Sequence, residues 1–276
     1  MRPSRSRIQR SAYVSWEHRG HADGHDQADW LAAEQELLFS HNYEVLRLVR
    51  LDGQGAAIIG ESNRKVCRFC ELSAPRVAFD KPVPALPRIL GGWPVFSADI
   101  CDDCHDQFRE SMDADLDAFL AAMKQGIPPR RVPIAAIKGL TRLALGFVPR
   151  AELDYFADAM EWVINPDNDL DRDALGPLCP QLEYSAEPFS TPWAAVARRV
   201  EEDDEPFPYL LFFLGVANHV VTLPVPLCQR DEDLEGLEMI VPEAGCSLGL
   251  DRLTIMANRP KARAMSPFHD LISVPV

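Results

Sequence analysis

Two pairs of cysteines, each with the spacing Cys-x-x-Cys, decide how the middle of this chain folds. They lie thirty residues apart, in the stretches Cys67-Arg68-Phe69-Cys70 and Cys101-Asp102-Asp103-Cys104-His105. Four thiolates complete the tetrahedral shell of a zinc ion, and each pair bends the chain so that both sulfurs face the metal. The spacing therefore predicts a structural zinc site whose ligands are Cys67, Cys70, Cys101 and Cys104. The gap has room for a hairpin, with strand-like pieces at residues 76–79 and 94–96.

Other interpretations of these cysteines exist. Cys101-x-x-Cys104-His105 also matches the attachment pattern of c-type haem, but the basic N-terminal residues lack the apolar segment of a secretory signal. We therefore expect a cytoplasmic protein with reduced thiols. An iron–sulfur cluster could use the same four thiolates, and a thioredoxin-like redox pair would need one cysteine pair in a βαβ context. Both remain open from the sequence.

The composition is that of an ordinary globular protein. The chain has 276 residues, 47% of them hydrophobic and 25% charged, which is enough for a sizeable core in one to three domains. No apolar run is long enough to span a bilayer, so we expect no membrane partner. The formal net charge of −14 argues against nucleic-acid binding through bulk electrostatics. Local basic groups nevertheless occur within residues 2–10, 130–142 and 259–263.

The first part of the chain, residues 5–40, predicts a small helical hairpin. Ile8, Ala12 and Trp16 recur at helical spacing, and a second apolar stripe begins near Asp26. The segment from about residue 7 to 38 resembles a short bacterial domain of unknown function with the pattern AYxxWExxG, GxD, W, AE. That pattern is matched here by Ala12-Tyr13-x-x-Trp16-Glu17-x-x-Gly20, Gly24-x-Asp26, Trp30 and Ala33-Glu34. The resemblance implies a bacterial origin and a docking module, so we expect a protein partner to bind through the hairpin.

The cysteine-bearing stretch resembles the zinc-knuckle branch of the HNH endonucleases over residues 64–110. In that branch the middle segment reads AHxIPExLGN and the second cysteine pair reads CDxCN. The matching residues here are Pro84-Ala-Leu-Pro87-Arg-Ile-Leu90-Gly91 and Cys101-Asp102-x-Cys104. The resemblance implies a treble-clef or ββα zinc module over residues 62–112, with DNA as the partner. It also implies one catalytic divalent ion, Mg²⁺ or Mn²⁺, in the ββα unit.

Departures from the family pattern limit what can be carried over. The family's first histidine, which is the general base, falls at Pro84, whose side chain has no proton acceptor and no metal ligand. The family's asparagine falls at His105, and its glutamate at Arg88. Losing the base costs on the order of a hundredfold or more in rate. We therefore expect an HNH-like scaffold that binds nucleic acid or protein and whose nuclease centre has decayed. The alternative is an active metal-dependent DNA endonuclease, acting in defence against foreign DNA, with His105 and Asp103 as catalytic residues.

The remainder, residues 113–276, predicts an α+β domain without recognisable chemistry. Helical periodicity covers residues 108–125, 132–145 and 150–163, and strand-like runs cover residues 182–184, 209–213, 219–223 and 237–241. Residues 41–60 fit either a hairpin or an ordered linker. No phosphate-binding loop, nucleophile elbow or His-Glu-x-x-His motif occurs. The expected fold class is therefore α+β, with a helical hairpin, a zinc module, and a domain of three helices and a small antiparallel sheet.

Overall fold

The structure is a computed structural model of the chain. It describes residues 2–18, 20–21, 23–52, 57–91, 94–127, 131–166, 180–185, 188–200, 206–232 and 236–238. The α-helices in these residues are α1 (Arg5–His18), α2 (Asp26–Asn42), α3 (Asp102–Ser111), α4 (Asp113–Lys124), α5 (Ile134–Phe147) and α6 (Ala157–Ile164). The strands are β1 (Tyr43–Arg50), β2 (Ala57–Ile59), β3 (Val83–Pro84), β4 (Val95–Ser97), β5 (Gln181–Tyr184), β6 (Trp193–Arg199), β7 (Leu210–Val216) and β8 (His219–Pro224). Short 3-10 helices are η1 (Arg88–Leu90), η2 (Arg150–Phe156) and η3 (Gln229–Asp231). The fold is mixed α+β with an antiparallel sheet, and no helix in the described ranges is long and apolar enough to cross a bilayer.

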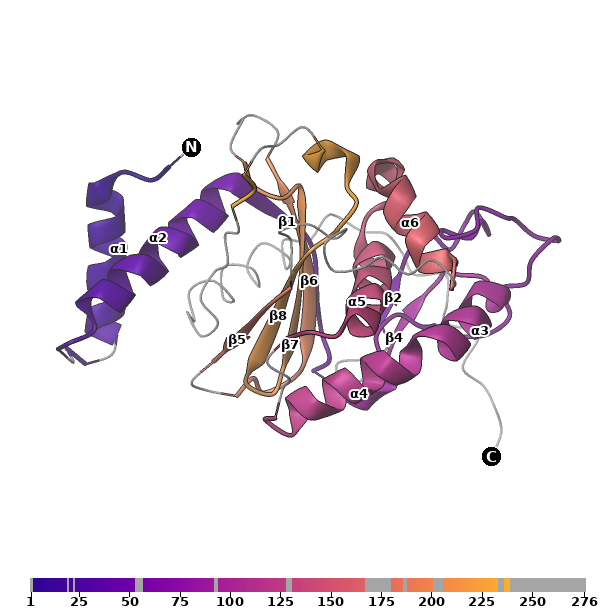
Figure 1. Cartoon of the computed structure of the whole chain (residues 1–276), viewed down its shortest axis with the longest axis horizontal. Helices are drawn as coiled ribbons and strands as arrows, with labels where there is room; N and C mark the ends of the chain where they lie inside the picture. Colours follow the sequence, from indigo (N-terminus) through magenta and orange to yellow (C-terminus); the bar gives the residue numbers. More distant parts are fainter. Residues whose placement is uncertain are drawn as a thin grey trace.

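The larger sheet has the strand order β1-β6-β7-β8-β5, and every pairing in it is antiparallel (Figure 1). Its two faces are easiest to see on the wholly buried strand β7. Leu210, Phe212 and Leu214 belong to the core that also contains α4 and α5, whereas Leu211 and Phe213 pack with residues at the end of α2. Successive side chains of a strand point to opposite faces, so apolar residues at every position indicate a sheet covered on both sides.

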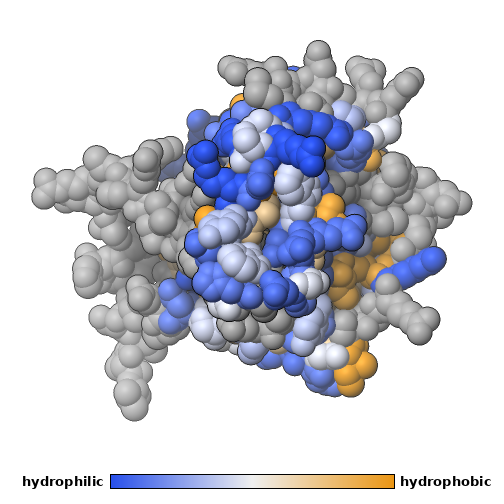
Figure 2. Space-filling model, turned by 90° about the vertical axis from the view of Figure 1, so that its left-hand side faces the viewer, coloured by the Kyte–Doolittle hydropathy of each residue, from blue (hydrophilic) through white to orange (hydrophobic). Residues whose placement is uncertain are grey.

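The N-terminal helices form an arm at one end of the molecule (Figure 1). They share a small core of their own, made by Ile8 of α1 with Ala33 and Leu37 of α2. Figure 2 looks onto this end and shows that its surface is largely hydrophilic. The core between the two helices is small, and the end of α2 is supported by the larger sheet, where Leu38 and Phe39 pack with Leu211 and Phe213.

The smaller sheet lies next to the cysteines and has the order β2-β4-β3. β3 and β4 are antiparallel, β2 and β4 are parallel, and α3 follows β4 directly. The side chains of Phe69 and Phe108 are in edge-to-face contact, with their ring centroids 4.8 Å apart, and belong to the same core as α5 and β7. The cysteine-bearing region therefore shares one continuous core with the helices that follow it. The expected division of the chain into a helical hairpin, a zinc module and an α+β domain, at residues 5–40, 62–112 and 113–276, stays a prediction.

Some expected elements differ in the structure. Residues 76–79 are not a strand, because the Arg76 amide donates to the Ser73 carbonyl in a turn. The helix expected over residues 150–163 is a 3-10 helix followed by α6, and the helix over residues 108–125 is divided at Met112 into α3 and α4. Of the strand expected at residues 237–241, Leu237 and Glu238 are not in a strand, and the rest lies outside the described residues.

Gly215 of β7 is required where it passes beneath the indole of Trp193. A Cβ atom at this position would lie 2.0 Å from Trp193 Nε1. Gly215→Ala is therefore expected to lower the free energy of unfolding by about 1–3 kcal/mol, as other overpacked cores do. Gly146→Ala is the matched control, because no heavy atom lies within 4 Å of its added Cβ. Urea denaturation of both variants checks this, and equal stabilities would contradict the predicted clash.

Candidate metal centre

The four cysteines converge from two separate segments. Cys67 and Cys70 lie in a tight turn, Cys101 is the N-cap of α3, and Cys104 lies in the first turn of that helix. All four sulfur atoms lie within 4.8 Å of one another, and those of Cys70 and Cys101 are 3.7 Å apart. Zinc–sulfur bonds of about 2.3 Å in a tetrahedron place two sulfurs roughly 3.8 Å apart. The cluster can therefore hold a metal ion such as zinc, and it is the sole cluster of this kind within the described residues.

The electrostatics of the cluster also favours a cation. A hydrogen bond from the Cys104 thiol lowers the pKa of Cys67 to about 5. Burial raises the pKa of Cys101 to about 12, and the hydrogen bond to Cys67 raises the pKa of Cys104. One thiolate forms readily, but a second or third buried thiolate would place more negative charge beside it with no positive charge to stabilise it. A divalent cation removes that obstacle, because it stabilises every thiolate that coordinates it.

Arg68 connects the first cysteine turn, residues 67–70, to α5. Its side chain is 1% exposed and forms an ion pair with Asp99 at 2.8 Å. Its Nη1 donates to the carbonyl groups of Leu145, Gly146 and Val148 at 2.6, 2.8 and 3.2 Å. The last carbonyl groups of a helix have no partner within the helix, and a cationic donor is favourable there. The metal-binding turn and the C-terminal end of α5 are thus held together by one buried guanidinium group.

Asp99 completes this buried network. Its carboxylate accepts hydrogen bonds from Arg68 Nε and Nη2, from Ser97 Oγ and from the Glu61 amide. Gly60, with φ of +86°, makes room for it, since a Cβ there would lie 2.1 Å from Asp99 Oδ1. Burial by itself would raise the pKa of Asp99, but the hydrogen bonds and the charge of Arg68, together with the hydrogen bonds from the Glu61 amide and Ser97 Oγ, outweigh that effect and lower it. The carboxylate is therefore charged at neutral pH.

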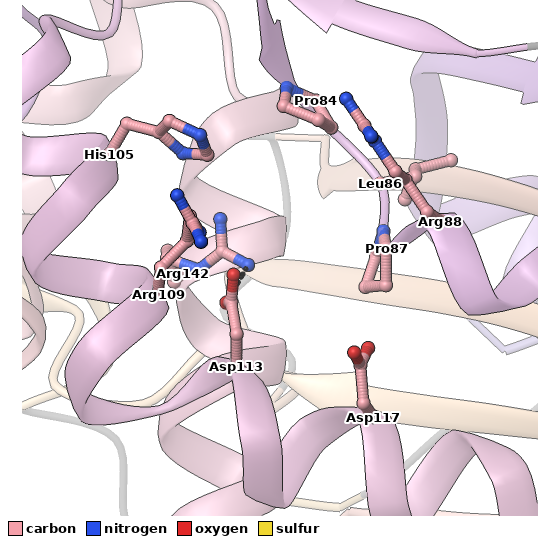
Figure 3. Close-up of a pocket in the computed structure, with 9 residues that line it drawn as sticks. All are labelled: Pro84, Leu86, Pro87, Arg88, His105, Arg109, Asp113, Asp117 and Arg142. Carbon is pink, nitrogen blue, oxygen red and sulfur yellow. Dashed lines mark hydrogen bonds and ion pairs between the residues drawn. The ribbon is translucent and has the colours of Figure 1, made fainter.

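A pocket of about 350 Å³ lies between the segment 84–88 and helices α3, α4 and α5 (Figure 3). Its lining residues are Pro84, Leu86, Pro87, Arg88, His105, Arg109, Asp113, Asp117 and Arg142. In Figure 3 the imidazole of His105 points from α3 towards Pro84, and the carboxylate of Asp117 points into the pocket from α4. The pocket thus has one proline-rich wall and one wall of charged and polar side chains.

The charges in the pocket are partly compensated. Arg142 is buried, forms an ion pair with Asp113 at 2.9 Å, and stacks on the ring of Phe108. Burial raises the pKa of Asp117, and the nearby Asp113 carboxylate raises it further. Burial lowers the pKa of His105, so its imidazole is uncharged at neutral pH. Among the residues that line the pocket, three arginines therefore face two carboxylates, and one of these arginines, Arg109, also lies 3.9 Å from the Asp106 carboxylate outside the lining.

The candidate catalytic residues expected from the sequence lie in different places. His105 lines the pocket opposite Pro84, whereas Asp103 is exposed and is not among the lining residues. The Asp102 carboxylate accepts hydrogen bonds from the backbone amides of Asp80 and Lys81 at 3.2 and 3.1 Å. Its role is therefore structural, since it fixes the loop at residues 80–81 to the start of α3. Sequence reasoning missed the α4 and α5 side chains of the pocket, which come from outside the cysteine-bearing stretch. One available signal was Arg142, a charged residue in the otherwise apolar half of α5.

Comparison with known proteins gives a partial match. The model of a family described as a protein of unknown function (DUF2934) matches residues 3–38, which comprise α1 and most of α2. The match overlaps the segment of about residues 7–38 that resembles a short domain of unknown function. No curated protein and no solved structure matches the chain. Similarity to a known family is therefore shown for the helical hairpin, while the metal centre rests on its own geometry.

Proposed function

We propose that this chain is a zinc-stabilised, HNH-like scaffold that binds nucleic acid at the pocket beside Pro84 without cleaving it. The observation that carries the proposal is the state of the pocket's charges. The Asp113 carboxylate is occupied by Arg142, while Arg88 and Arg109 are exposed beside it. Guanidinium groups bind phosphate oxygens through two parallel hydrogen bonds. Arg88 and Arg109 are both exposed, and Arg109 lies 3.9 Å from Asp106, so with the Asp113 carboxylate neutralised by Arg142 the pocket suits a phosphodiester better than a metal ion.

The order of the local elements supports the HNH-like part of the proposal. A cysteine turn is followed by the antiparallel strands β3 and β4 and then by α3, which carries the second cysteine pair. A ββα unit of the treble-clef type has this order. Pro84 lies in β3, where it pairs with Phe96, and it offers no imidazole to the pocket. This supports a binding site in which the nuclease centre has decayed. A protein partner at the α1–α2 hairpin is the second part of the proposal.

Binding of nucleic acid is expected to depend on Arg109. Arg109→Glu should weaken binding of a short DNA duplex by about tenfold at low salt, because it replaces a phosphate contact with a repulsive charge. Arg64→Glu is the matched control, since Arg64 and Arg109 are 66% and 65% exposed and each lies next to one acidic side chain of its own segment. Fluorescence anisotropy at several salt concentrations measures both. Equal losses in the two variants would argue for non-specific attraction and against the pocket.

An active endonuclease is the second candidate, and one observation favours it. The imidazole of His105 is uncharged at neutral pH and faces the pocket, so it could accept a proton or bind a metal ion. A plasmid-cleavage assay with Mg²⁺ or Mn²⁺, run on protein of known zinc content beside His105→Ala, separates the candidates. Our proposal expects no cleavage by either protein and DNA binding by both. Cleavage by the native chain that is lost in His105→Ala would establish the enzyme instead.

A further inference from the structure

The pocket beside Pro84 contains one acidic side chain without a partner in the fold. Asp117 projects into it from α4 and is half-buried, and among the described residues no hydrogen bond or ion pair involves its carboxylate (Figure 3). Asp113, the other carboxylate of the lining, is by contrast paired with Arg142. An ionised carboxylate only accepts hydrogen bonds, so the two oxygens of Asp117 are open to two donors of a ligand.

A buried donor of the same pocket has no acceptor. The side chain of Arg142 is 6% exposed, and its Nη2 donates to Asp113 at 2.9 Å. Its Nε is buried and, within the described part of the chain, has no hydrogen-bond partner. Arg142 also lies near enough to Asp117 for the two charges to interact. Because an unpaired buried donor costs free energy, a ligand that suits the pocket offers an acceptor to Arg142 beside its two donors to Asp117.

The size of the pocket and its remaining wall indicate a small ring system. A volume of about 350 Å³ lies at the lower end of the roughly 300–1,000 Å³ of ligand sites, so a base can enter the pocket and a duplex cannot. Pro84 and Pro87 are partly exposed and offer apolar surface on which the face of a ring can pack. Arg88 and Arg109 are exposed beside it, where the phosphate groups of a strand can reach them.

Among the bases of nucleic acids, guanine has the matching edge. Its ring N–H and its 2-amino group are two adjacent donors, and its carbonyl oxygen is an acceptor next to them. Adenine and cytosine have a single amino donor beside an acceptor nitrogen, and thymine has one N–H between two carbonyl groups. A carboxylate therefore accepts two hydrogen bonds from guanine and one from any other base. The same guanine groups form the base pair in a duplex, so the base has to be unpaired.

We propose that the pocket beside Pro84 binds one unpaired guanine of a nucleic-acid strand. Asp117 accepts the two hydrogen bonds from the base, and the guanidinium group of Arg142 donates to its carbonyl oxygen. Arg88 and Arg109 contact the neighbouring phosphate groups. This inference rests on the nucleic-acid binding proposed above and names the base that is bound. Because extruding a base from a duplex costs free energy, single strands are the preferred partner.

Fluorescence anisotropy of the full chain with short labelled oligothymidine strands tests the choice of base. The strands differ in one central base, which is guanine, hypoxanthine, adenine or thymine. The guanine strand is expected to bind about tenfold more tightly than the adenine strand, and the hypoxanthine strand, which lacks the 2-amino group, should fall between them. Equal affinities would overturn this inference and leave phosphate binding in place. Absence of binding by every strand would overturn the proposed function together with the inference.

Free guanosine monophosphate distinguishes a strand from a nucleotide as the source of the base. It should displace the guanine strand only at a concentration at least about tenfold above that of an unlabelled guanine strand, because it lacks the second phosphate contact. Displacement by both competitors at equal concentrations would mean that the pocket binds a free nucleotide, and it would overturn the strand as the partner.

Asp117→Asn is expected to abolish the preference for guanine, because the amide keeps one acceptor and turns a donor towards the donors of the base. Asp115→Asn is the matched control, since Asp115 is an exposed aspartate of the same helix that does not line the pocket. Each substitution removes one negative charge, so both variants should bind plain oligothymidine equally well. A guanine preference that survives in Asp117→Asn, or that is lost equally in Asp115→Asn, would overturn the proposal.

Discussion

Cys67→Ser is expected to release the metal ion and to unfold the cysteine-bearing region. A structural zinc ion contributes on the order of 10 kcal/mol to folding, and a typical domain has a total stability of only about 5–15 kcal/mol. Cys67 is buried, and the hydrogen bond from the Cys104 thiol lowers its pKa to about 5, so a thiolate ligand forms readily at this position. Metal analysis and thermal unfolding measure the effect. The expected result is loss of the bound metal and a free energy of unfolding lower by more than about 5 kcal/mol.

Cys228→Ser provides the control for this experiment. Cys228 is also buried, but it lies outside the cluster, and burial raises the pKa of its thiol to about 12. Its replacement should leave the metal content unchanged and cost about 1–3 kcal/mol, as a newly buried hydroxyl group does. Cys104→Ser should behave like Cys67→Ser. A Cys67→Ser protein with full metal content and unchanged melting would refute the metal site.

Asp99→Asn is expected to have the second-largest effect. The substitution leaves the guanidinium group of Arg68, which is 1% exposed, without its counter-charge. Removing one partner from a buried ion pair typically costs about 3–5 kcal/mol. Arg68 also holds the carbonyl groups at the end of α5, so the damage should spread from the cysteine turn to the helices of the core. Urea denaturation at neutral pH measures the loss, and Asp80→Asn, at an exposed loop carboxylate, should change it by less than about 0.5 kcal/mol.

The same carboxylate gives the native protein a characteristic response to acid. Because the pKa of Asp99 is lower in the folded state than in the unfolded state, its contribution is complete above the unfolded value of about 4. It is lost as the pH falls below that value towards the folded pKa. The difference in unfolding free energy between the native protein and Asp99→Asn should therefore shrink on acidification below pH about 4. A difference that stays constant over this range would contradict the assigned ion pair.

The cluster of cysteines could be predicted from the sequence because its information is local. Each Cys-x-x-Cys spacing fixes two ligands, and the structure brings the four sulfurs together as that spacing predicts. The network beneath the cluster could not be predicted in this way. Arg68 meets its partners at Asp99 and at Leu145 to Val148, and nothing in the adjacent sequence indicates those distant contacts. Side chains that meet through the tertiary fold leave no short-range pattern.

The sheet illustrates the same limit. The runs at residues 209–213 and 219–223 are rich in leucine, phenylalanine and valine and predict two strands. The structure has β8 at nearly these bounds, His219–Pro224, whereas β7, Leu210–Val216, extends three residues further. β6 was missed, because its sequence Trp193-Ala-Ala-Val-Ala-Arg-Arg199 contains three alanines and only one β-branched residue. It is a strand because it lies between β1 and β7, which supply hydrogen bonds on both sides. Residues 41–60, for which the sequence left a hairpin or an ordered linker open, contain β1 at residues 43–50, which is an edge strand paired with β6, and the short strand β2 at residues 57–59.

The junction between the N-terminal arm and the sheet has a mechanical consequence. α2 ends at Asn42 and β1 begins at Tyr43, so no flexible loop separates them, and β1 is paired with β6 through seven residue pairs. Leu38 and Phe39 also fix the end of α2 on the sheet. A pull on the arm along the direction of β1 would therefore load all the hydrogen bonds of this ladder in shear at once, because they lie perpendicular to the strands. Tension applied to the arm would thus be transmitted through the sheet into the body of the molecule.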